Sequence, residues 1–303
     1  MKELTFVVQG KIHSNTKNCL SSIRLYYPES TIILSTWKDE PVSHLHYDVL
    51  LENEDPGAWE IDKDFYFNIN RQIISTRNGL QAVKTPFAVK MRTDTQIVDR
   101  LIPELLKQTA AGQLFKSKIL ACNFFFRDPR KFPLLFHIGD IFQAGFTDDL
   151  IDLWDIELSQ EKFVRIERNN FLIFNDFRTM NLRYVPEQYL FVTFLAKHKI
   201  HVSLDYCCEM SWEKALLSES LIAKNFKILT IDELGIHLPV RLIVEKLPLT
   251  VYQSSTLDNF STNPAQKKLK RMIYKHRWRL IRKFLRSPSL WVDFFKKVIP
   301  KSN

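Results

Sequence analysis

The stretch Phe87-Ala88-Val89-Lys90-Met91-Arg92-Thr93-Asp94-Thr95-Gln96 decides the fold. Its first half, from Phe87 to Met91, is apolar and rich in residues that favour strands, which predicts a buried strand. The strand ends in a polar tip that carries Arg92 and Asp94. In an open α/β sheet, ligands bind in the crevice beyond the carboxyl ends of the strands. We therefore expect both side chains at a binding site.

Two interpretations of Arg92 and Asp94 are open. A carboxylate at a strand tip can reach a bound divalent cation, and an arginine two residues earlier points to the same side of the pleat, where it can pair with a phosphate. That combination suits a nucleotide-sugar diphosphate. In the other interpretation, the arginine and the aspartate pair with each other and only close the strand end.

Strand and helix patterns alternate along the chain, which predicts an α/β fold. Apolar runs predict strands at 4–8, 31–37 and 47–51, and apolar residues three and four apart predict a helix at 17–27. A strand, a helix and a strand at this spacing predict a right-handed parallel crossover. Neither a Gly-x-Gly-x-x-Gly motif nor a Walker loop occurs, so both standard phosphate cradles are excluded. Further elements are predicted at 67–83 (helix), 101–108 (helix), 119–126 (strand) and 225–231 (strand).

The helix predicted at 67–83 carries a polar face. Arg71, Ser75 and Asn78 recur at i, i+4 and i+7 and therefore share that face. The apolar residues Ile69, Ile73, Leu80 and Val83 lie opposite and are expected to pack on the sheet. Arg71 is either a solvated surface charge or a ligand-binding group. The short connection to the Asp94 strand favours the second role.

Two more carboxylates are candidate site residues. Asp140 stands among bulky apolar residues between Gly139 and Gly145, where it is either an acceptor-binding group or base, or a capping residue. Glu187 follows Pro186 in the first turn of a predicted helix. It either complements the helix dipole or serves as an active-site carboxylate on a rigid support.

These segments resemble the WavE lipopolysaccharide-synthesis family of bacterial glycosyltransferases. The resemblance rests on Val8-Gln9-Gly10, Ser35-Thr36-Trp37, Asn68 to Gln72 with Gly79-Leu80, Lys90 to Asp94, Gly139 to Gly145 and Pro186 to Leu190. It runs from about residue 4 to 250. It implies a GT-A-like fold, a Rossmann-type nucleotide-sugar-binding sheet flanked by helices, that transfers a sugar from a nucleotide donor onto a growing surface glycan, in lipopolysaccharide or capsule.

The resemblance also implies roles for single residues. Asp94 would hold Mn²⁺ or Mg²⁺ on the diphosphate of the donor and ease its departure. Either Asp140 or Glu187 would take the proton of the acceptor hydroxyl in an inverting reaction, whereas a retaining reaction needs no such base. The donor would lie against Gln9, Gly10, Ser35, Thr36, Trp37, Asn70, Arg71 and Arg92.

The predicted metal site departs from the family pattern. GT-A enzymes commonly hold their cation through Asp-x-Asp at this strand end, and here the sequence is Asp94-Thr95-Gln96. The second acid is missing, which weakens the case for tight metal binding. A divalent cation nevertheless needs few protein carboxylates when phosphate oxygens complete its ligand shell.

The charge of the chain is concentrated at one end. Residues 264–303 hold 13 of the 43 Lys and Arg residues against a single acid, Asp293. Leu269, Ile273, Leu280 and Phe284 form one helical stripe beneath these cations, a pattern typical of a helix at a membrane interface. The other interpretation is that the stripe packs on the protein and the lysines face water. No run of about 18 apolar residues predicts a membrane span.

We therefore expect a glycosyltransferase domain at 1–250 and a basic amphipathic tail at 264–303. The tail would bind the anionic inner face of the cell membrane, with the protein otherwise cytoplasmic and acting on a glycan or lipid-linked glycan. The four cysteines show no CxxC spacing, which suits a reducing compartment. Two alternatives are a non-catalytic sugar- or nucleotide-binding domain and a protein that binds anionic surfaces or nucleic acid through its tail. Nucleic acid is not expected as a partner, because the body lacks recognisable nucleic-acid modules.

Overall fold

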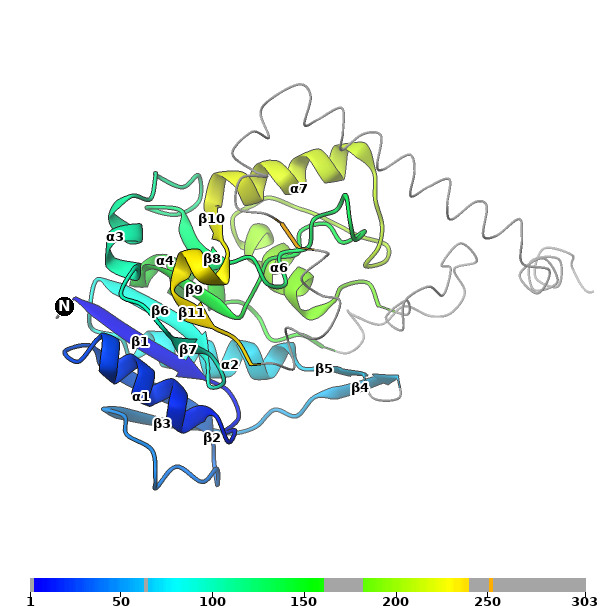
Figure 1. Cartoon of the computed structure of the whole chain (residues 1–303). Helices are drawn as coiled ribbons and strands as arrows, with labels where there is room; N and C mark the ends of the chain where they lie inside the picture. Colours follow the sequence, from blue (N-terminus) through cyan, green and yellow to red (C-terminus); the bar gives the residue numbers. More distant parts are fainter. Residues whose placement is uncertain (1–2, 63–64, 161–181, 240–250, 253–303) are drawn as a thin grey trace, which may run out of the picture.

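The computed structural model describes residues 3–62, 65–160, 182–239 and 251–252 (Figure 1). Its strands are β1 (Leu4–Gln9), β2 (Thr31–Trp37), β3 (Val49–Asn53), β4 (Trp59–Asp62), β5 (Phe65–Phe67), β6 (Phe87–Arg92), β7 (Gln96–Ile97), β8 (Ile119–Cys122), β9 (Phe142–Phe146), β10 (Phe226–Leu229) and β11 (Ile236–His237). Its helices are α1 (Thr16–Tyr26), α2 (Ile69–Gln81), α3 (Ile102–Lys107), α4 (Thr147–Trp154), α6 (Pro186–Lys197), α7 (Trp212–Asn225) and α8 (Ile231–Leu234).

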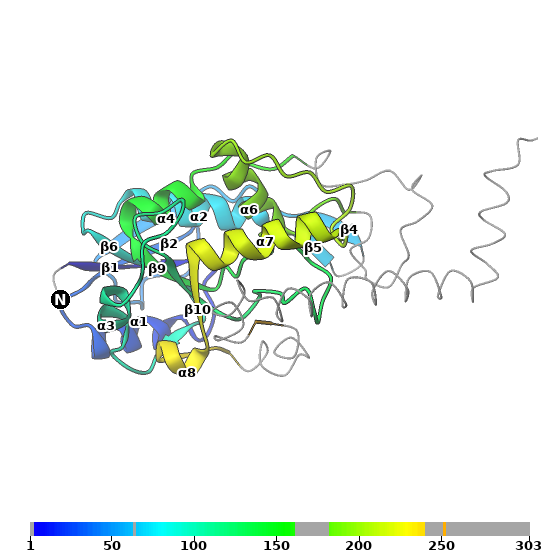
Figure 2. The same cartoon turned by 90° about the horizontal axis from the view of Figure 1, so that it is seen from above.

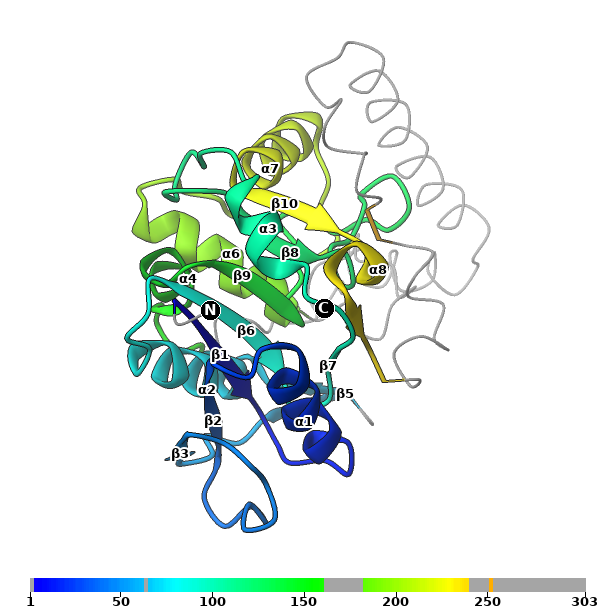
Figure 3. The ribbon, with the colours of Figure 1, turned by 60° about the vertical axis from the view of Figure 1, so that its left-hand side comes forward.

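A mostly parallel sheet of seven strands forms the centre, in the order β10-β8-β9-β6-β1-β2-β3 (Figure 3). Strand β9 runs antiparallel to both of its neighbours, and the remaining neighbouring pairs of this sheet are parallel. The chain leaves β1 towards β2 and β3 on one side and returns to β6 on the other. The strand order therefore reverses between β1 and β6, where open α/β sheets bind their ligands.

Helices cover both faces of this sheet, as the view from above shows (Figure 2). Helices α2, α4 and α6 lie on one face, and α1, α3 and α8 lie on the other. Side chains alternate along β1: Val7 packs in the same apolar cluster as Ile73 of α2, whereas Phe6 and Val8 pack with Leu20 of α1. A strand buried on both faces reads as a continuous apolar run, which explains why the sequence reveals β1 clearly.

The structure confirms the predicted α/β class and the parallel crossover through α1. Several of the predicted helix and strand bounds are wrong by a few residues. Hydrophobic periodicity shows which residues are buried, whereas the end of an element is defined by its last backbone hydrogen bond. The largest error concerns the strand predicted at 119–126, since β8 ends at Cys122. The chain turns there, with the Phe126 N–H donating to the Asn123 carbonyl and Phe125 in the left-handed region at a φ of 64°.

Two predictions cannot be followed in the structure. The basic tail at 264–303 lies outside the described residues, as do residues 240–250 at the end of the predicted domain. Among the helices that the structure describes, none is long and apolar enough to cross a membrane.

Candidate functional site

A pocket of about 370 Å³ opens beyond the carboxyl ends of β1, β2 and β6. It lies at the point where the strand order reverses, which is the expected place for a ligand in this architecture. The pocket is lined by Gln9, Gly10, Lys11, His13, Trp37, Lys38, Glu40, Asp55, Asn68, Arg71, Gln72, Arg92, Thr93 and Asp140. Its size falls within the ordinary range for small-molecule sites, and its lining is rich in charged groups.

Six residues that the sequence singles out come together in this lining: Gln9, Gly10, Trp37, Arg71, Arg92 and Asp140. The other candidates lie outside it. Asn70 instead closes two hydrogen bonds with Ser159, donating to its carbonyl at 2.9 Å and accepting from its N–H at 2.7 Å. Ser35 is fully buried and accepts a hydrogen bond from Asn53 at 3.0 Å. Thr36, Asp94 and Glu187 also lie outside the pocket lining.

The turn after β1 brings backbone to the pocket. Gly10 has a φ of 114°, which an L side chain rarely adopts. Its N–H donates to the Ser35 carbonyl at 3.0 Å, so the chain turns while still bonded to β2. The Gln9 side chain accepts a hydrogen bond from Ser75 of α2 at 2.7 Å. The polar face predicted for α2 therefore meets the strand ends.

Arg71 projects from α2 into the pocket lining and is held there by Asp55. Its Nε and Nη2 atoms donate to the two oxygens of Asp55 at 2.7 and 2.6 Å. The hydrogen bonds from Arg71 lower the pKa of Asp55, and the pair stays well exposed. The sequence did not identify Asp55, because it is one of several acids in the acidic segment 52–64 with no spacing that marks it.

Arg92 and Asp94 form a second bidentate pair at the tip of β6. Arg92 Nε and Nη2 donate to the two Asp94 oxygens, both at 3.0 Å. The side chain of Asp94 is 3% exposed, while that of Arg92 is 27% exposed and lines the pocket. Of the two groups that the sequence places at this strand end, the arginine is therefore the one that a ligand meets.

The residues at this tip do not fit the Mn²⁺ or Mg²⁺ site predicted at Asp94. Both carboxylate oxygens of Asp94 already accept hydrogen bonds from the Arg92 guanidinium. Gln96 belongs to strand β7, where it is paired with His237 of β11. In the part of the chain that the structure describes, no three His, Cys, Asp or Glu side chains are grouped to hold a metal. Phosphate oxygens of a donor could supply the remaining ligands of such a cation, so the misfit rests on the pairing of Asp94 with Arg92.

A buried lysine lies beneath the pocket. Lys90 of β6 is fully buried, donates a hydrogen bond to the Asp140 carbonyl and lies 4.6 Å from the ring centroid of Trp154. Burial lowers its pKa to about 8, although the charge of Asp140 opposes this effect. A lysine in the middle of an otherwise apolar strand is the sequence signal that could have identified it, since lysine is almost never fully buried without a partner.

Asp140 lines the pocket, and Glu187 lies close to it at the start of α6. Burial, followed by the negative charge of Asp140, raises the pKa of Glu187 to about 7. His137 Nε2 lies 3.5 Å from a Glu187 oxygen. Burial and the charge of Arg127 lower the pKa of His137 to about 3, so this imidazole is neutral at physiological pH. Glu187, whose pKa is raised, thus lies near a second carboxylate, Asp140, which lines the pocket.

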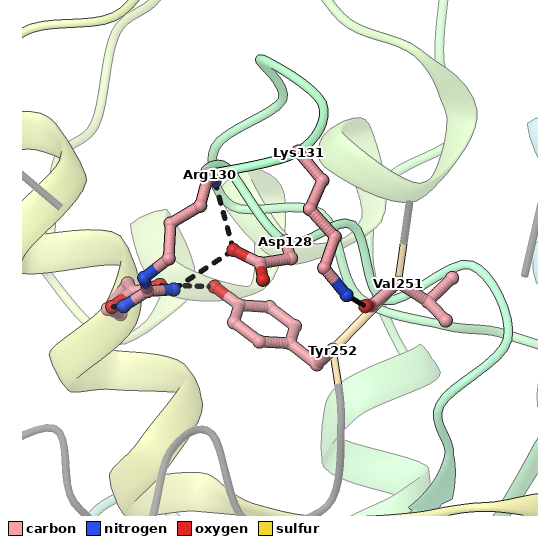
Figure 4. Close-up of polar contacts among 6 residues, drawn as sticks. Asp128, Arg130, Lys131, Val251 and Tyr252 are labelled. Carbon is pink, nitrogen blue, oxygen red and sulfur yellow. Dashed lines mark hydrogen bonds and ion pairs between the residues drawn. The ribbon is translucent and has the colours of Figure 1, made fainter. Parts of the chain in front are cut away.

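A buried cluster fixes the loop between β8 and β9, which carries His137 and Asp140. The cluster consists of Asp128, Arg130, Glu219 and Tyr252, and Figure 4 labels three of them. Arg130 donates to both Glu219 oxygens at 2.6 Å and to Asp128 at 2.9 Å. The Tyr252 hydroxyl donates to Glu219 at 2.7 Å, and the Tyr252 N–H donates to the Phe126 carbonyl at 3.0 Å. The loop is therefore tied to α7 and to residues 251–252.

Comparison with known proteins places the chain in a family. The family model described as WavE lipopolysaccharide synthesis matches residues 4–290, nearly the whole sequence. No curated protein matches the chain. Because the family match covers nearly the whole sequence, including the pocket, the Arg130 cluster and both bidentate arginine–aspartate pairs, the chain belongs to the WavE lipopolysaccharide-synthesis family.

Proposed function

We propose that this protein is a glycosyltransferase that moves a sugar from a nucleotide-sugar donor onto a bacterial surface glycan. The observation that carries the proposal is the pocket at the strand-order reversal, where Arg71 and Arg92 reach one cavity from two different elements. A family role in lipopolysaccharide synthesis supports it, because assembling such a glycan requires sugar transfer.

The charges around the pocket suit a donor that carries phosphates. Lys11, Lys38, Arg71 and Arg92 all contribute to the lining. Arginine presents N–H donors in a planar fork that matches phosphate oxygens. The indole of Trp37 adds an aromatic surface in the same cavity. The donor diphosphate would lie against the two arginines, and its nucleoside against the β1–β2 side of the pocket.

Three carboxylates, Glu40, Asp55 and Asp140, line the pocket, and we infer that Asp140, which interacts with Arg92, acts on the acceptor. It lines the same pocket as Arg92, so an acceptor hydroxyl beside the donor would meet it. In an inverting reaction, Asp140 would take the hydroxyl proton as the new glycosidic bond forms and the nucleoside diphosphate leaves. Glu187, whose pKa is about 7, would gain or lose a proton near neutral pH and so change the electrostatic environment of Asp140. In a retaining reaction, Asp140 would only orient the acceptor.

The basic tail suggests where the reaction takes place. We propose that residues 264–303 attach the protein to an anionic membrane surface, where a lipid-linked acceptor would be available. Flotation with liposomes checks this: full-length protein should rise with phosphatidylglycerol vesicles at low salt and be released at high salt. Protein that ignores anionic vesicles, or that binds neutral phosphatidylcholine equally well, would rule the attachment out.

A panel of nucleotide sugars tests the proposed activity. Full-length protein is first screened by thermal shift, because a ligand that binds the folded state raises its stability by mass action. The donor that responds is then incubated with lipopolysaccharide from a strain with a truncated glycan, and the released nucleotide is measured. Binding without release would instead favour a non-catalytic sugar- or nucleotide-binding domain.

A further inference from the structure

We propose that Arg92, held in position by Asp94, balances the charge of the donor diphosphate, and that sugar transfer in this protein needs no divalent cation. This inference rests on the proposed glycosyltransferase function. It assigns Asp94 as a positioning residue and Arg92 as the group that contacts the ligand.

Asp94 lies on the interior side of the pair and Arg92 on the pocket side. Asp94 is 3% exposed and does not line the pocket, whereas Arg92 is 27% exposed and does. A phosphate entering the pocket therefore meets the guanidinium first. Asp94 takes up two of the five N–H donors that an arginine offers, so others remain for an anion.

Several charged groups surround Arg92 at the tip of β6. Burial disfavours the charged form of Arg92, but the carboxylates of Asp94, Asp140 and Glu187 together raise its pKa above the ordinary value. Lys90, two positions earlier in the same strand, adds a further buried amine. The Arg92 guanidinium donates to both Asp94 oxygens, so a divalent cation bound to Asp94 would have to displace Arg92 from this carboxylate.

A second bidentate pair, Arg71 with Asp55, lines the same pocket. Arg71 is held by Asp55 with the same geometry as Arg92 by Asp94, and both arginines line the pocket. Each guanidinium is thus oriented before a ligand arrives, which reduces the entropy lost on binding. The two oriented arginines therefore present N–H donors to a leaving diphosphate, in the place of the contacts that a metal would otherwise make with it.

Calorimetric titration of the full-length protein tests this inference. UDP, GDP, ADP and CMP are each titrated in EDTA and again with MnCl₂. We expect the nucleotide that binds to show the same affinity within about twofold in both buffers. The free-ion EPR signal of manganese should be the same with nucleotide alone and with nucleotide plus protein, because free diphosphates also bind Mn²⁺. Affinity that requires Mn²⁺, or a loss of free-ion signal beyond that caused by nucleotide alone, would overturn the inference and leave the glycosyltransferase proposal standing.

Two variants separate the positioning role from a metal-ligand role. In EDTA, Asp94→Asn and Arg92→Ala should each weaken nucleotide binding by about tenfold or more, as expected for a charge-assisted hydrogen bond. In the Arg92→Ala background, adding Asp94→Asn should change the affinity no further, because the arginine through which Asp94 acts is gone. Circular dichroism checks that each variant is folded.

If Asp94→Asn binds like wild type in EDTA and loses affinity only with Mn²⁺, Asp94 is a metal ligand. If no nucleotide binds wild-type protein in either buffer, the proposed function itself fails.

Discussion

Gly79 of α2 lies directly against Val7 of β1. A Cβ atom at residue 79 would stand 2.4 Å from Val7 Cγ1 and 3.3 Å from the Ser35 Cβ atom. Real Cβ atoms do not approach other heavy atoms this closely, and valine has little freedom to rotate away. The missing side chain therefore lets α2 rest on β1 and β2. This close approach places Arg71 and Ser75 of the same helix above the strand ends.

Gly79→Ala should lower the free energy of unfolding. Overpacking costs roughly 1–3 kcal/mol, and the better helix propensity of alanine returns about 1 kcal/mol of it. Gly145→Ala is the matched control, since its Cβ would lie at an ordinary 3.6 Å from Ile119 Cγ1. Urea unfolding of both variants measures the difference. Equal stability of the two would show that α2 does not depend on the close approach.

Arg71→Ala should weaken donor binding through the loss of a phosphate contact. The side chain is 40% exposed, so we expect a loss of about 1–2 kcal/mol, below that of a buried charge pair. Arg24→Ala is the control, because Arg24 forms a similarly exposed pair with Asp48 and lies outside the pocket lining. Calorimetry with the donor identified by thermal shift measures both. Equal affinity in the two variants would remove Arg71 from the site.

Much of the fold could be predicted because the parallel strands are buried on both faces. The runs at 4–8 and 31–37 mark β1 and β2 almost to the residue. The antiparallel direction of β9 could not be predicted, since periodicity reports burial and not strand direction. The pattern of apolar residues at 142–146 is the same for a parallel and for an antiparallel strand.

The candidate site was predictable where residues follow a strand end or share a helix face, as with Gln9, Arg71 and Arg92. The hydrogen-bonding and ion-pair partners of the side chains at the site could not be predicted from the sequence. The pairing of Arg71 with Asp55 follows from tertiary packing. Arg130 and Glu219, 89 residues apart in sequence, meet only through the packing of α7.

The stability of the protein should depend on pH through Glu187. Its pKa is raised to about 7, so between the ordinary carboxyl value of 4.5 and about 7 the folded protein keeps a proton that the unfolded chain has released. Glu187 therefore contributes a free energy of unfolding that falls as pH rises through this window, against the rise that the lowered pKa of His137 contributes between about 3 and its ordinary value of 6.5. Glu187→Gln should remove this fall. Glu104→Gln, at an exposed position in α3, is the control and should keep the wild-type profile. A fall of the same size in the Glu187 variant would contradict the assignment.

Glu219→Gln should destabilise the loop that carries Asp140. The carboxylate is fully buried and accepts from Arg130 and Tyr252, so neutralising it leaves a buried guanidinium poorly compensated. Breaking a buried pair in this way costs roughly 3–5 kcal/mol. Glu104→Gln, whose pair with Lys107 is exposed, should stay within about 0.5 kcal/mol of wild type. Thermal unfolding compares them, and a cost below about 1 kcal/mol for Glu219→Gln would show that the cluster is dispensable.

The most direct test of the central claim is transfer of labelled sugar by wild-type protein and by Asp140→Asn. Each is incubated with the donor identified by thermal shift and with lipopolysaccharide of truncated glycan, and label in the glycan is counted. Wild-type protein should incorporate label, and Asp140→Asn should bind the donor with unchanged affinity but lose about 10²-fold or more of the rate, as expected when a general base is removed. A wild-type protein that consumes no donor, or a variant that transfers at the wild-type rate, would contradict the account.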